Sequence, residues 1–481
     1  MCRGKGACLL YLLIHFLCLR VFNFKIQQNT NSMKSMKLLY TLAIPVVFML
    51  SCKKFLDIKP KGVIIAETVN DYEGILNADG IVNPFGLNVP VIYPTDDLAD
   101  QSFSTQSLTS PKGNLYFWVE YINNSTVRPD LWADMYNRIA NLNVVTEGVL
   151  SATDGTPQQK KQLYAEAVTD KVFNYFHLLS FFSPAFDPAT AGSNYGVPYI
   201  ISTDVSQPLP VRPSLQVSYA SMINDLTSVL GDLPVSNINN TRATKNVAYG
   251  MLTRIYMSMG DYTNALKYAN LVLNSGKAVL LDYNDYIGTS LPATNSSPEE
   301  LWVRYGGNLT FRYSNELLSK YDLDADLRIK FLATKKEDGS YNYGSLQSYN
   351  PNRGLTYAEI YLDKAECLAR AGDIAGALEI VNQDIRTKRF APDNYVPLKA
   401  STTEEAIAAV LLERRRELAF KGLRWSDMKR LDKEGRMPAV QRIGKDGVTV
   451  LSILKPGSSN YTFQIPLAVQ SFNPTMPLNK R

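Results

Sequence analysis

Residues 361–377 read Tyr-Leu-Asp-Lys-Ala-Glu-Cys-Leu-Ala-Arg-Ala-Gly-Asp-Ile-Ala-Gly-Ala, and this stretch is the strongest indication of the architecture. Its apolar residues recur at intervals of three or four, which is the spacing of one face of an α-helix. Gly372-Asp373 then ends that helix and begins another, because glycine suits a helix end and aspartate caps a helix start. Ala377 is small enough to let the two helices approach closely. The stretch therefore predicts a helical hairpin.

A second stretch, residues 249–265, has the same organisation. It carries apolar residues at helical spacing, a Gly-Asp pair at 260–261 and an alanine four residues after the aspartate. Such a unit resembles a tetratricopeptide repeat. Gly372 lies 112 residues after Gly260, so the two units do not form a tandem array.

The rest of the chain also favours helices separated by loops. Helical spacing of apolar residues extends over 129–145, 158–182, 218–230 and 401–418. The last of these helices begins with a capping box, Ser-Thr-Thr-Glu-Glu, and its charge run Glu-Arg-Arg-Arg-Glu is expected to pair in part across a helix interface. Pro-, Asn- and Gly-rich loops lie between the helices. The sequence predicts a mainly α fold, a tetratricopeptide-like helical scaffold with long irregular loops and a few short strands.

The region before Cys52 is typical of a lipoprotein signal. Met36-Lys37 gives a charged start, a short apolar core follows, and a small residue precedes the cysteine. The apolar core is shorter than the roughly 20 residues that a bilayer span needs. We therefore expect residues 1–51 to be a signal segment, and Cys52 to carry lipid and to open a single domain over 52–481. Residues 1–35 are interpreted as the result of a start codon placed too early; the alternative is an N-terminal anchor helix.

Loss of the signal segment changes the charge and cysteine content of the chain. Six of the 50 Lys and Arg precede Cys52, which leaves 44 against 45 Asp and Glu. A near-neutral chain lacks the basic surface that nucleic acids require, so no nucleic-acid partner is expected. Cys367 and His177 then remain as the one unmodified cysteine and the one histidine, both in apolar helical stretches. We expect no intramolecular disulfide, no metal site and no cofactor.

Several motifs are spread over nearly all of residues 52–481. The most specific is residues 413–430, Glu-Arg-Arg-Arg-Glu-Leu-Ala-Phe-x-Gly-x-Arg-Trp-x-Asp-Met-Lys-Arg. The others are Cys52-Lys53-Lys54-Phe55-Leu56-Asp57-x-x-Pro60, Trp132-x-x-Met135-Tyr136-x-x-Ile139-x-x-x-Asn143, the segment 355–366, and Phe463-Gln464-Ile465-Pro466 followed by Asn473-Pro474. Together they resemble the SusD/RagB family of Bacteroidetes outer-membrane lipoproteins. The chain departs from the family at Lys421, where glutamate is usual.

This resemblance implies capture of a nutrient rather than catalysis. It implies an N-terminal SusD-like part over about 52–235 and a C-terminal SusD/RagB part over about 236–481. Cys52 would anchor the protein by lipid to the outer membrane, exposed at the cell surface. The implied partners are an oligosaccharide or peptide ligand and a SusC-like TonB-dependent transporter that receives it.

Aromatic side chains in loops are the candidates for stacking against sugar rings. Tyr116 and Trp118 lie just before the helix that begins near residue 129, where the resemblance places ligand-binding aromatic residues. Their alternation also suits a half-buried strand, so both interpretations stay open.

A second group of candidates lies in a Gly-, Asn- and Pro-rich region. Its members would supply stacking faces and hydrogen-bond donors, with an ordinary solvated loop as the alternative: Tyr341, Asn342, Tyr343, Tyr349 and Arg353. Asp96 and Asp97 could accept hydrogen bonds from sugar hydroxyls, but the pattern favours a helix cap.

No arrangement of catalytic residues stands out in the sequence. It contains no Gly-x-Ser-x-Gly elbow and no glycine-rich phosphate loop, and no spacing singles out a pair of carboxylates. The alternative to nutrient capture is a tetratricopeptide-type scaffold that binds proteins in the cell envelope. The long loops around 290–356, which a pure scaffold does not need, favour capture.

Overall fold

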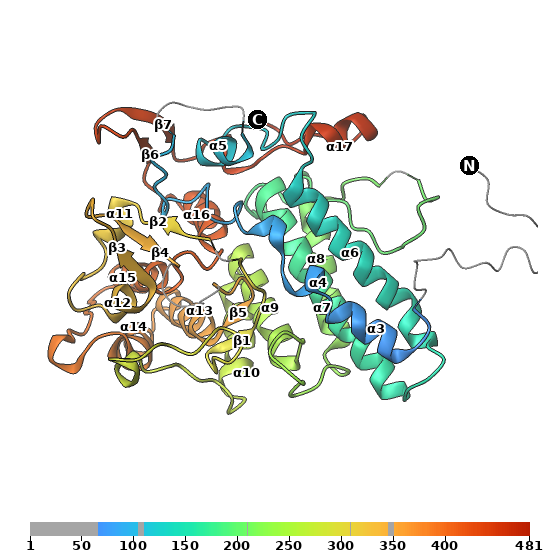
Figure 1. The fold of residues 1–481 in the computed structure, drawn as a ribbon, viewed down its shortest axis with the longest axis horizontal. Coiled ribbons are helices and arrows are strands. Elements are labelled where there is room, and N and C mark those ends of the chain that lie inside the picture. The colour runs from blue at the N-terminus through green and yellow to red at the C-terminus, as the bar shows by residue number, and fades with distance from the viewer. Residues whose placement is uncertain (1–65, 104–109, 209, 308, 345–350) are drawn as a thin grey trace, which may run out of the picture. The chain divides into compact units, whose positions relative to one another are not determined.

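Helices dominate the computed structural model, which describes residues 66–481 apart from 104–109, 209, 308 and 345–350 (Figure 1). The described part of the chain forms one unit, Ala66–Arg481. The expected mainly α fold is confirmed, whereas Cys52 and Tyr349 lie outside the described residues. None of the helices described here combines the length and the apolar character that crossing a membrane requires.

Two long helices organise the N-terminal half, and both begin close to their expected positions. α6 spans Asp130–Gly148 and packs against α7, Pro157–Phe182. Thr156 and Gln159 form a capping box at the start of α7, with proline at its first position. Helix α7 is buried along most of its length because other helices surround it. Among the described residues, the other α-helices of this half are α3 (Val69–Leu76), α4 (Asp79–Val82), α5 (Pro111–Tyr116) and α8 (Leu215–Val229).

Both expected helical hairpins are present, and they lie side by side. The first consists of α9 (Lys245–Met259) and α10 (Tyr262–Leu273), and the second of α13 (Tyr357–Arg370) and α14 (Ile374–Glu379). Helix α10 packs against α13, so the units are neighbours in space despite their separation in sequence. α15 (Thr403–Glu417) packs on α13 and α14 and extends this helical stack.

The Gly-Asp turns act as the sequence predicted. Gly260 and Gly372 have φ values of 73° and 85°, which a residue with a Cβ rarely adopts. Asp261 and Asp373 cap the second helix of each hairpin by accepting hydrogen bonds from backbone amides three residues later. These local interactions explain why the same short pattern produces the same turn twice.

In the described part of the chain, short strands form three small antiparallel sheets among the loops. β1 (Glu300–Trp302) pairs with β5 (Leu355–Thr356), and β6 (Val440–Ile443) pairs with β7 (Val450–Leu454). The third sheet has the order β2-β4-β3, with β2 at Phe311–Arg312, β4 at Tyr341–Tyr343 and β3 at Ala333–Lys335. Short helices complete the fold: α11 (Asn315–Leu318), α12 (Leu327–Leu332), α16 (Arg424–Lys433) and α17 (Leu467–Phe472).

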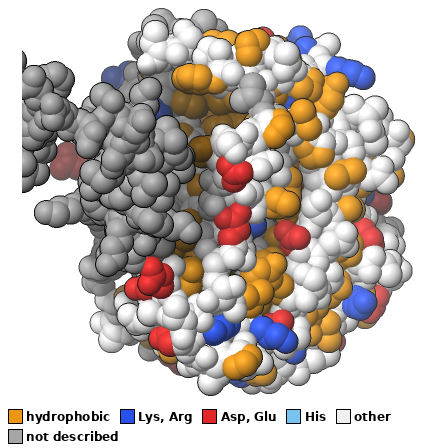
Figure 2. All heavy atoms as spheres, turned by 90° about the vertical axis from the view of Figure 1, so that its right-hand side faces the viewer, with side chains coloured by type: hydrophobic (Ala, Val, Ile, Leu, Met, Phe, Trp, Pro, Cys, Tyr) orange, Lys and Arg blue, Asp and Glu red, His pale blue; other side chains and the backbone are white. Residues whose placement is uncertain are grey.

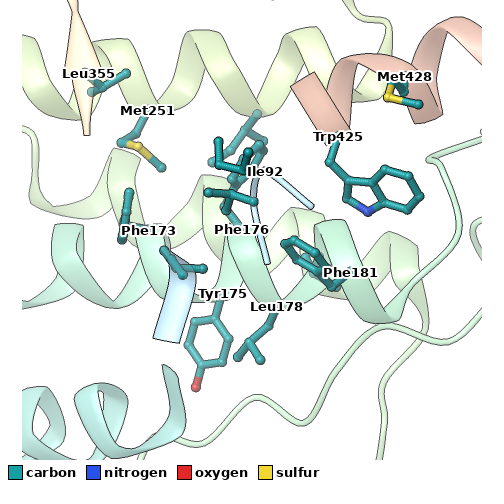
Figure 3. Packing of buried hydrophobic residues seen from close by; sticks show 14 of the residues in the cluster. Ile92, Phe173, Tyr175, Phe176, Leu178, Phe181, Met251, Leu355, Trp425 and Met428 are labelled. Carbon is teal, nitrogen blue, oxygen red and sulfur yellow. The ribbon is translucent and has the colours of Figure 1, made fainter. Parts of the chain in front are cut away.

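The main core lies where α7, α9 and α16 meet (Figure 3). Phe181 of α7 stacks on Trp425 of α16 with ring centroids 6.5 Å apart. Trp132, Trp302 and Trp425 are all buried. His177 and Cys367 are buried as well, in agreement with a packing role.

On the side of α3 and α6, hydrophobic side chains stand among polar and acidic ones (Figure 2). Val144 of α6, for example, is exposed. Single exposed apolar side chains are normal on a protein surface and do not by themselves indicate a site.

The charge run at 413–417 pairs across element interfaces, as expected. Arg328 of α12 contacts Glu413 at 2.7 Å and Glu417 at 3.0 Å, and Arg389 contacts Glu417 at 2.8 Å. Burial alone would raise the pKa of Glu417, but Arg389 and Arg328 hold the pKa well below its usual range. The run therefore joins α15 to α12 and to the segment that follows α14.

Glu300 should make stability depend on pH in an identifiable way. Burial raises the pKa of Glu300 to about 7, although Lys421 opposes the shift. The stabilisation from the protonated carboxyl is present below about pH 4.5 and is lost as the pH rises through about 7. In Glu300→Gln this loss disappears. Between about pH 4.5 and 8, the wild type should therefore lose up to about 3 kcal/mol of unfolding free energy relative to the variant.

Urea unfolding of both proteins at the two pH values would measure this change. Other carboxyl groups with raised pKa values remain in both proteins, so they cancel in the comparison. A difference that stays constant with pH would contradict a protonated Glu300 in the folded state.

Candidate functional site

Two adjoining hollows flank residues 98–101. The sheet hollow has a volume of about 670 Å³ and lies against the β2-β4-β3 sheet. The hairpin hollow has a volume of about 450 Å³ and lies against the β6–β7 hairpin. Both are lined by Leu98, Ala99, Asp100, Gln101 and Arg312, which form the wall between them. Volumes of about 300–1,000 Å³ are typical of small-molecule sites.

The β2-β4-β3 sheet holds this wall in place. Leu98 forms an antiparallel bridge with Tyr313, and the Ala99 amide donates a hydrogen bond to the Arg312 carbonyl at 3.0 Å. Arg312 lies directly opposite Asn342 in the β2–β4 pair. Because opposite residues in antiparallel strands share a face, the guanidinium and the amide both border the sheet hollow.

A hydrogen-bonded carboxylate stands beside Arg312. Arg312 Nη1 donates to Asp338 Oδ2 at 3.0 Å, and Ser340 donates to Asp338 Oδ1 from both its amide and its hydroxyl. The bonds from Ser340, and to a lesser degree Arg312, lower the pKa of Asp338 to about 2. Asp338 therefore stays ionised at neutral pH and can accept hydrogen bonds from a ligand.

Asp100 is oriented by three neighbours. Its Oδ2 accepts a hydrogen bond from Tyr93 Oη at 3.0 Å, and its Oδ1 accepts bonds from the amide and hydroxyl of Ser102. Its amide donates to Tyr116 Oη at 3.1 Å. Burial and the Asp100 carboxylate raise the pKa of Tyr93 well above its ordinary value, so the phenol remains a donor.

The two hollows together offer groups suited to a polyhydroxylated ligand. Arg312 and Asn342 can donate hydrogen bonds, while Asp100 and Asp338 can accept them. Tyr93 contributes a small aromatic surface to the sheet hollow, whereas the Phe311 ring is 3% exposed and stacks on Phe420. This combination of fixed polar groups and aromatic surface resembles the usual lining of a ligand pocket.

Tyr116 and Trp118 are buried, as a core strand would place them, but the strand itself is absent. Tyr116 ends α5, and Trp118 follows in a turn with φ of 55°, so neither residue lies in a strand. Trp118 is only 1% exposed. Its Nε1 donates a hydrogen bond to the Pro94 carbonyl at 2.8 Å, and the Arg442 guanidinium lies over its ring at 4.4 Å. The expectation that Trp118 forms an exposed platform for a sugar is therefore wrong, because this side chain belongs to the core. Tyr116 is also buried, but it lines part of the hairpin hollow.

The favoured cap role of Asp96 and Asp97 is wrong, because an arginine pair from the 413–430 motif holds both carboxylates. Arg424 forms two hydrogen bonds of 2.6 Å with Asp96, and Arg415 contacts Asp97 at 3.0 Å. Burial opposes ionisation, but Arg424 and Arg415 keep the pKa of Asp96 well below its usual range. Asp96 borders the hairpin hollow, whereas Asp97 is enclosed behind it.

The second group of candidates is split between the hollow and the core. Asn342 lines the sheet hollow, and Tyr341 is half-buried at the neighbouring position of β4. Tyr343 is buried, with its ring 4.9 Å from that of Phe420. Arg353 is buried too and donates a hydrogen bond to the Phe420 carbonyl. The expectation that Tyr343 and Arg353 lie in an open loop is corrected, because β4 and the pairing of β5 with β1 draw these residues inward.

Sequence reasoning missed several residues of the hollows, notably Asp100, Gln101, Arg312, Asp338 and Gln441. The prediction of Asp96 and Asp97 identified the correct segment, but the residues that line both hollows follow directly after them at 98–101. Arg312 carries no local signal, since its role depends on pairing with a strand 30 residues later.

Comparisons with known proteins agree with this fold. Residues 54–257 match a family described as "Starch-binding associating with outer membrane", and residues 329–464 match the SusD family. The two matches cover more than two thirds of the chain. The search of curated proteins gave no match.

Solved structures with the same fold come from Bacteroides species. A SusD superfamily protein of Bacteroides thetaiotaomicron aligns with a TM-score of 0.71 at 19% identity, covering 86% of this chain and 100% of that one. A putative sugar binding protein of Bacteroides vulgatus gives 0.69 at 22% identity, with 87% and 99% covered. Surface glycan-binding protein A of Bacteroides uniformis gives 0.64 at 18% identity, with 86% and 99% covered. With both halves matched by family models, this chain belongs to the SusD family.

Proposed function

We propose that the protein captures an oligosaccharide at the outer membrane, with the sheet hollow and the hairpin hollow as its binding site. The observation that carries this proposal is the shared wall at residues 98–101 and Arg312, which presents polar groups to two adjoining hollows. The descriptions of the matched family and of similar structures, which mention starch, sugar, glycan and laminarin, support a saccharide over a peptide.

The proposed binding mode follows from the geometry of the wall. A chain of sugar rings would pass over residues 98–101, with one part in each hollow. Arg312 would donate to hydroxyl or ring oxygens, and Asp100 would accept from hydroxyl groups. The exposed part of Tyr93 would contact the apolar face of a ring. The ligand would leave chemically unchanged, because the protein would bind it without catalysing a reaction.

Bound sugar would then be delivered to a transporter in the same membrane. Cys52 would carry the lipid that anchors the protein at the outer membrane, facing the outside. A SusC-like TonB-dependent transporter would then receive the oligosaccharide from the hollows. Anchoring would raise the effective concentration of captured ligand near the transporter.

Arg312→Ala should weaken saccharide binding at least tenfold while the protein stays folded. The guanidinium borders both hollows, so its removal leaves sugar oxygens without a donor on either side. Calorimetric titration with maltoheptaose and laminarihexaose would measure the effect. Arg128→Ala is a matched control, because Arg128 also pairs with aspartates but lies on the exposed surface near α6. Equal loss of affinity in both variants, or no binding of either sugar to the wild type, would contradict the proposed site.

A further inference from the structure

A third cavity lies apart from residues 98–101 and has a strongly basic lining. Its volume is about 190 Å³, and its walls come from α16 and from residues 184–195, 457–462 and 479–481. We call it the basic cavity. Four cationic side chains line it: Lys429, Lys433, Lys480 and Arg481. Nothing in the proposed capture of a neutral oligosaccharide uses these groups.

Lys429 is the most unusual residue of the basic cavity. It is 5% exposed, and its Nζ donates hydrogen bonds to the carbonyls of Ser180, at 2.7 Å, and Ser183. No carboxylate of the described residues lies within 4.0 Å of this ammonium group. Buried lysines are normally paired with an anion, because desolvation of an isolated charge is unfavourable. Here burial lowers the pKa of Lys429 to about 7.

The other charged groups of the basic cavity are partly paired: Arg481, for example, contacts Glu120 at 3.5 Å. Asp432 is the acidic residue of the lining, and its carboxylate accepts hydrogen bonds from the Gly457 amide. Lys433 is paired at 3.2 Å with Asp187 outside the cavity. Lys480 has no ion pair within the described residues.

A buried hydroxyl group also lines the basic cavity. Tyr461 is 5% exposed, and its Oη has no hydrogen-bond partner among the described residues. Native structures rarely leave such a group unsatisfied unless a water, an ion or a ligand completes it. An occupant that accepts a hydrogen bond would therefore satisfy Tyr461 as well as Lys429.

We infer that the basic cavity binds one acidic sugar residue through its carboxylate or sulfate oxygens. The anion would lie against Lys429 and Lys480, with Tyr461 Oη as a neutral donor. The cavity is smaller than the about 300–1,000 Å³ of sites for drug-sized ligands, so it suits one compact residue rather than a chain of rings. This site is separate from the two hollows and would let the protein distinguish acidic from neutral glycans.

The charge state of Lys429 provides a specific signature of this binding. A bound anion favours the protonated ammonium, so binding at about pH 8 should take up protons, and affinity should fall as the pH rises through about 7. The other titratable or charged groups that face the cavity are Tyr195, Asp432, Lys433, Tyr461, Lys480 and Arg481.

Calorimetric titration of the wild type at pH 8 in two buffers of different ionisation enthalpy would test the inference. The probes are galacturonic acid against galactose, N-acetylglucosamine 6-sulfate against N-acetylglucosamine, and inorganic sulfate alone. At least one acidic sugar should bind with proton uptake, while its neutral counterpart should bind at least tenfold more weakly. Lys480→Ala should reduce the affinity at least threefold, and Lys455→Ala, which removes an exposed lysine outside the cavity, should not.

Lys429→Met should abolish both binding and proton uptake. Since this variant removes a buried side chain and risks misfolding, Lys480→Ala at an exposed position provides the independent test. Equal binding of acidic and neutral sugars, sulfate binding as tightly as the acidic sugars, absence of proton uptake, or unchanged affinity in Lys480→Ala would each overturn the inference. Binding of maltoheptaose and its sensitivity to Arg312→Ala would remain, so failure here is distinguishable from failure of the proposed capture site.

Discussion

Replacing Arg389 by methionine should lower the free energy of unfolding by about 3–5 kcal/mol, because it leaves buried carboxylates without their cation. Arg389 is completely buried and contacts Glu417 at 2.8 Å and Glu299 at 2.9 Å. It also donates to the Leu281 carbonyl at 2.6 Å. Arg328 remains near Glu417 in the variant, but Glu299 loses the ion pair that the structure shows for it. Urea unfolding at neutral pH would measure the change.

Arg436→Met is the matched control for this experiment. Arg436 also contacts two carboxylates, Glu404 at 2.8 Å and Glu434 at 3.1 Å, but its side chain is 27% exposed. Exposed ion pairs contribute about 0–1 kcal/mol, since water and salt already solvate and screen their charges. Similar losses of stability in the two variants would show that burial does not set the strength of the 413–417 network.

The helical framework could be predicted because its signals are local. The Gly-Asp turns at 260–261 and 372–373 need only adjacent residues to end one helix and cap the next. The capping box of α15, Thr402 with Glu405, is equally local. The packing of α10 against α13 could not be predicted from the sequence, because it depends on how the chain between the two helices folds.

The candidate site could be predicted only in part, because its walls join distant segments. Asp96 and Arg424 are separated by 328 residues, yet their bidentate contact fixes the segment that leads into the hollows. The pairing of Arg312 with Asn342 likewise depends on strand register. A carboxylate in such a network and a carboxylate at a helix start look alike in sequence.

Aromatic residues were the hardest to assign, since the same side chains serve as core and as ligand platforms. Tyr341 and Tyr343 lie two positions apart on β4 and therefore share a face, yet Tyr341 is half-buried whereas Tyr343 packs against Phe420. The sequence shows that aromatic residues occur in the segments near the site, but only the tertiary structure determines which of their side chains reach the hollow. The buried Trp118 is the clearest case.

Trp118→Ala should therefore act mainly on stability, lowering the free energy of unfolding by about 3–5 kcal/mol. The substitution removes a buried indole, leaves the Pro94 carbonyl without its donor and uncovers Arg442, which lies 4.4 Å from the ring. Urea unfolding, with Phe472→Ala as a control at an 82% exposed position, would measure the difference. A fully stable Trp118→Ala protein that has lost only saccharide binding would show instead that the ring acts as an exposed platform.

The backbone at Trp118 allows a sharper version of the same experiment. Its φ of 55° lies in the left-handed region, where a Cβ is unfavourable by roughly 1–2 kcal/mol and glycine is not. If the turn keeps this conformation, Trp118→Gly should be at least as stable as Trp118→Ala, although glycine usually destabilises a folded chain relative to alanine by about 0.4–1 kcal/mol. If the glycine variant is instead the less stable of the two, the turn of the variants does not hold residue 118 in the left-handed conformation.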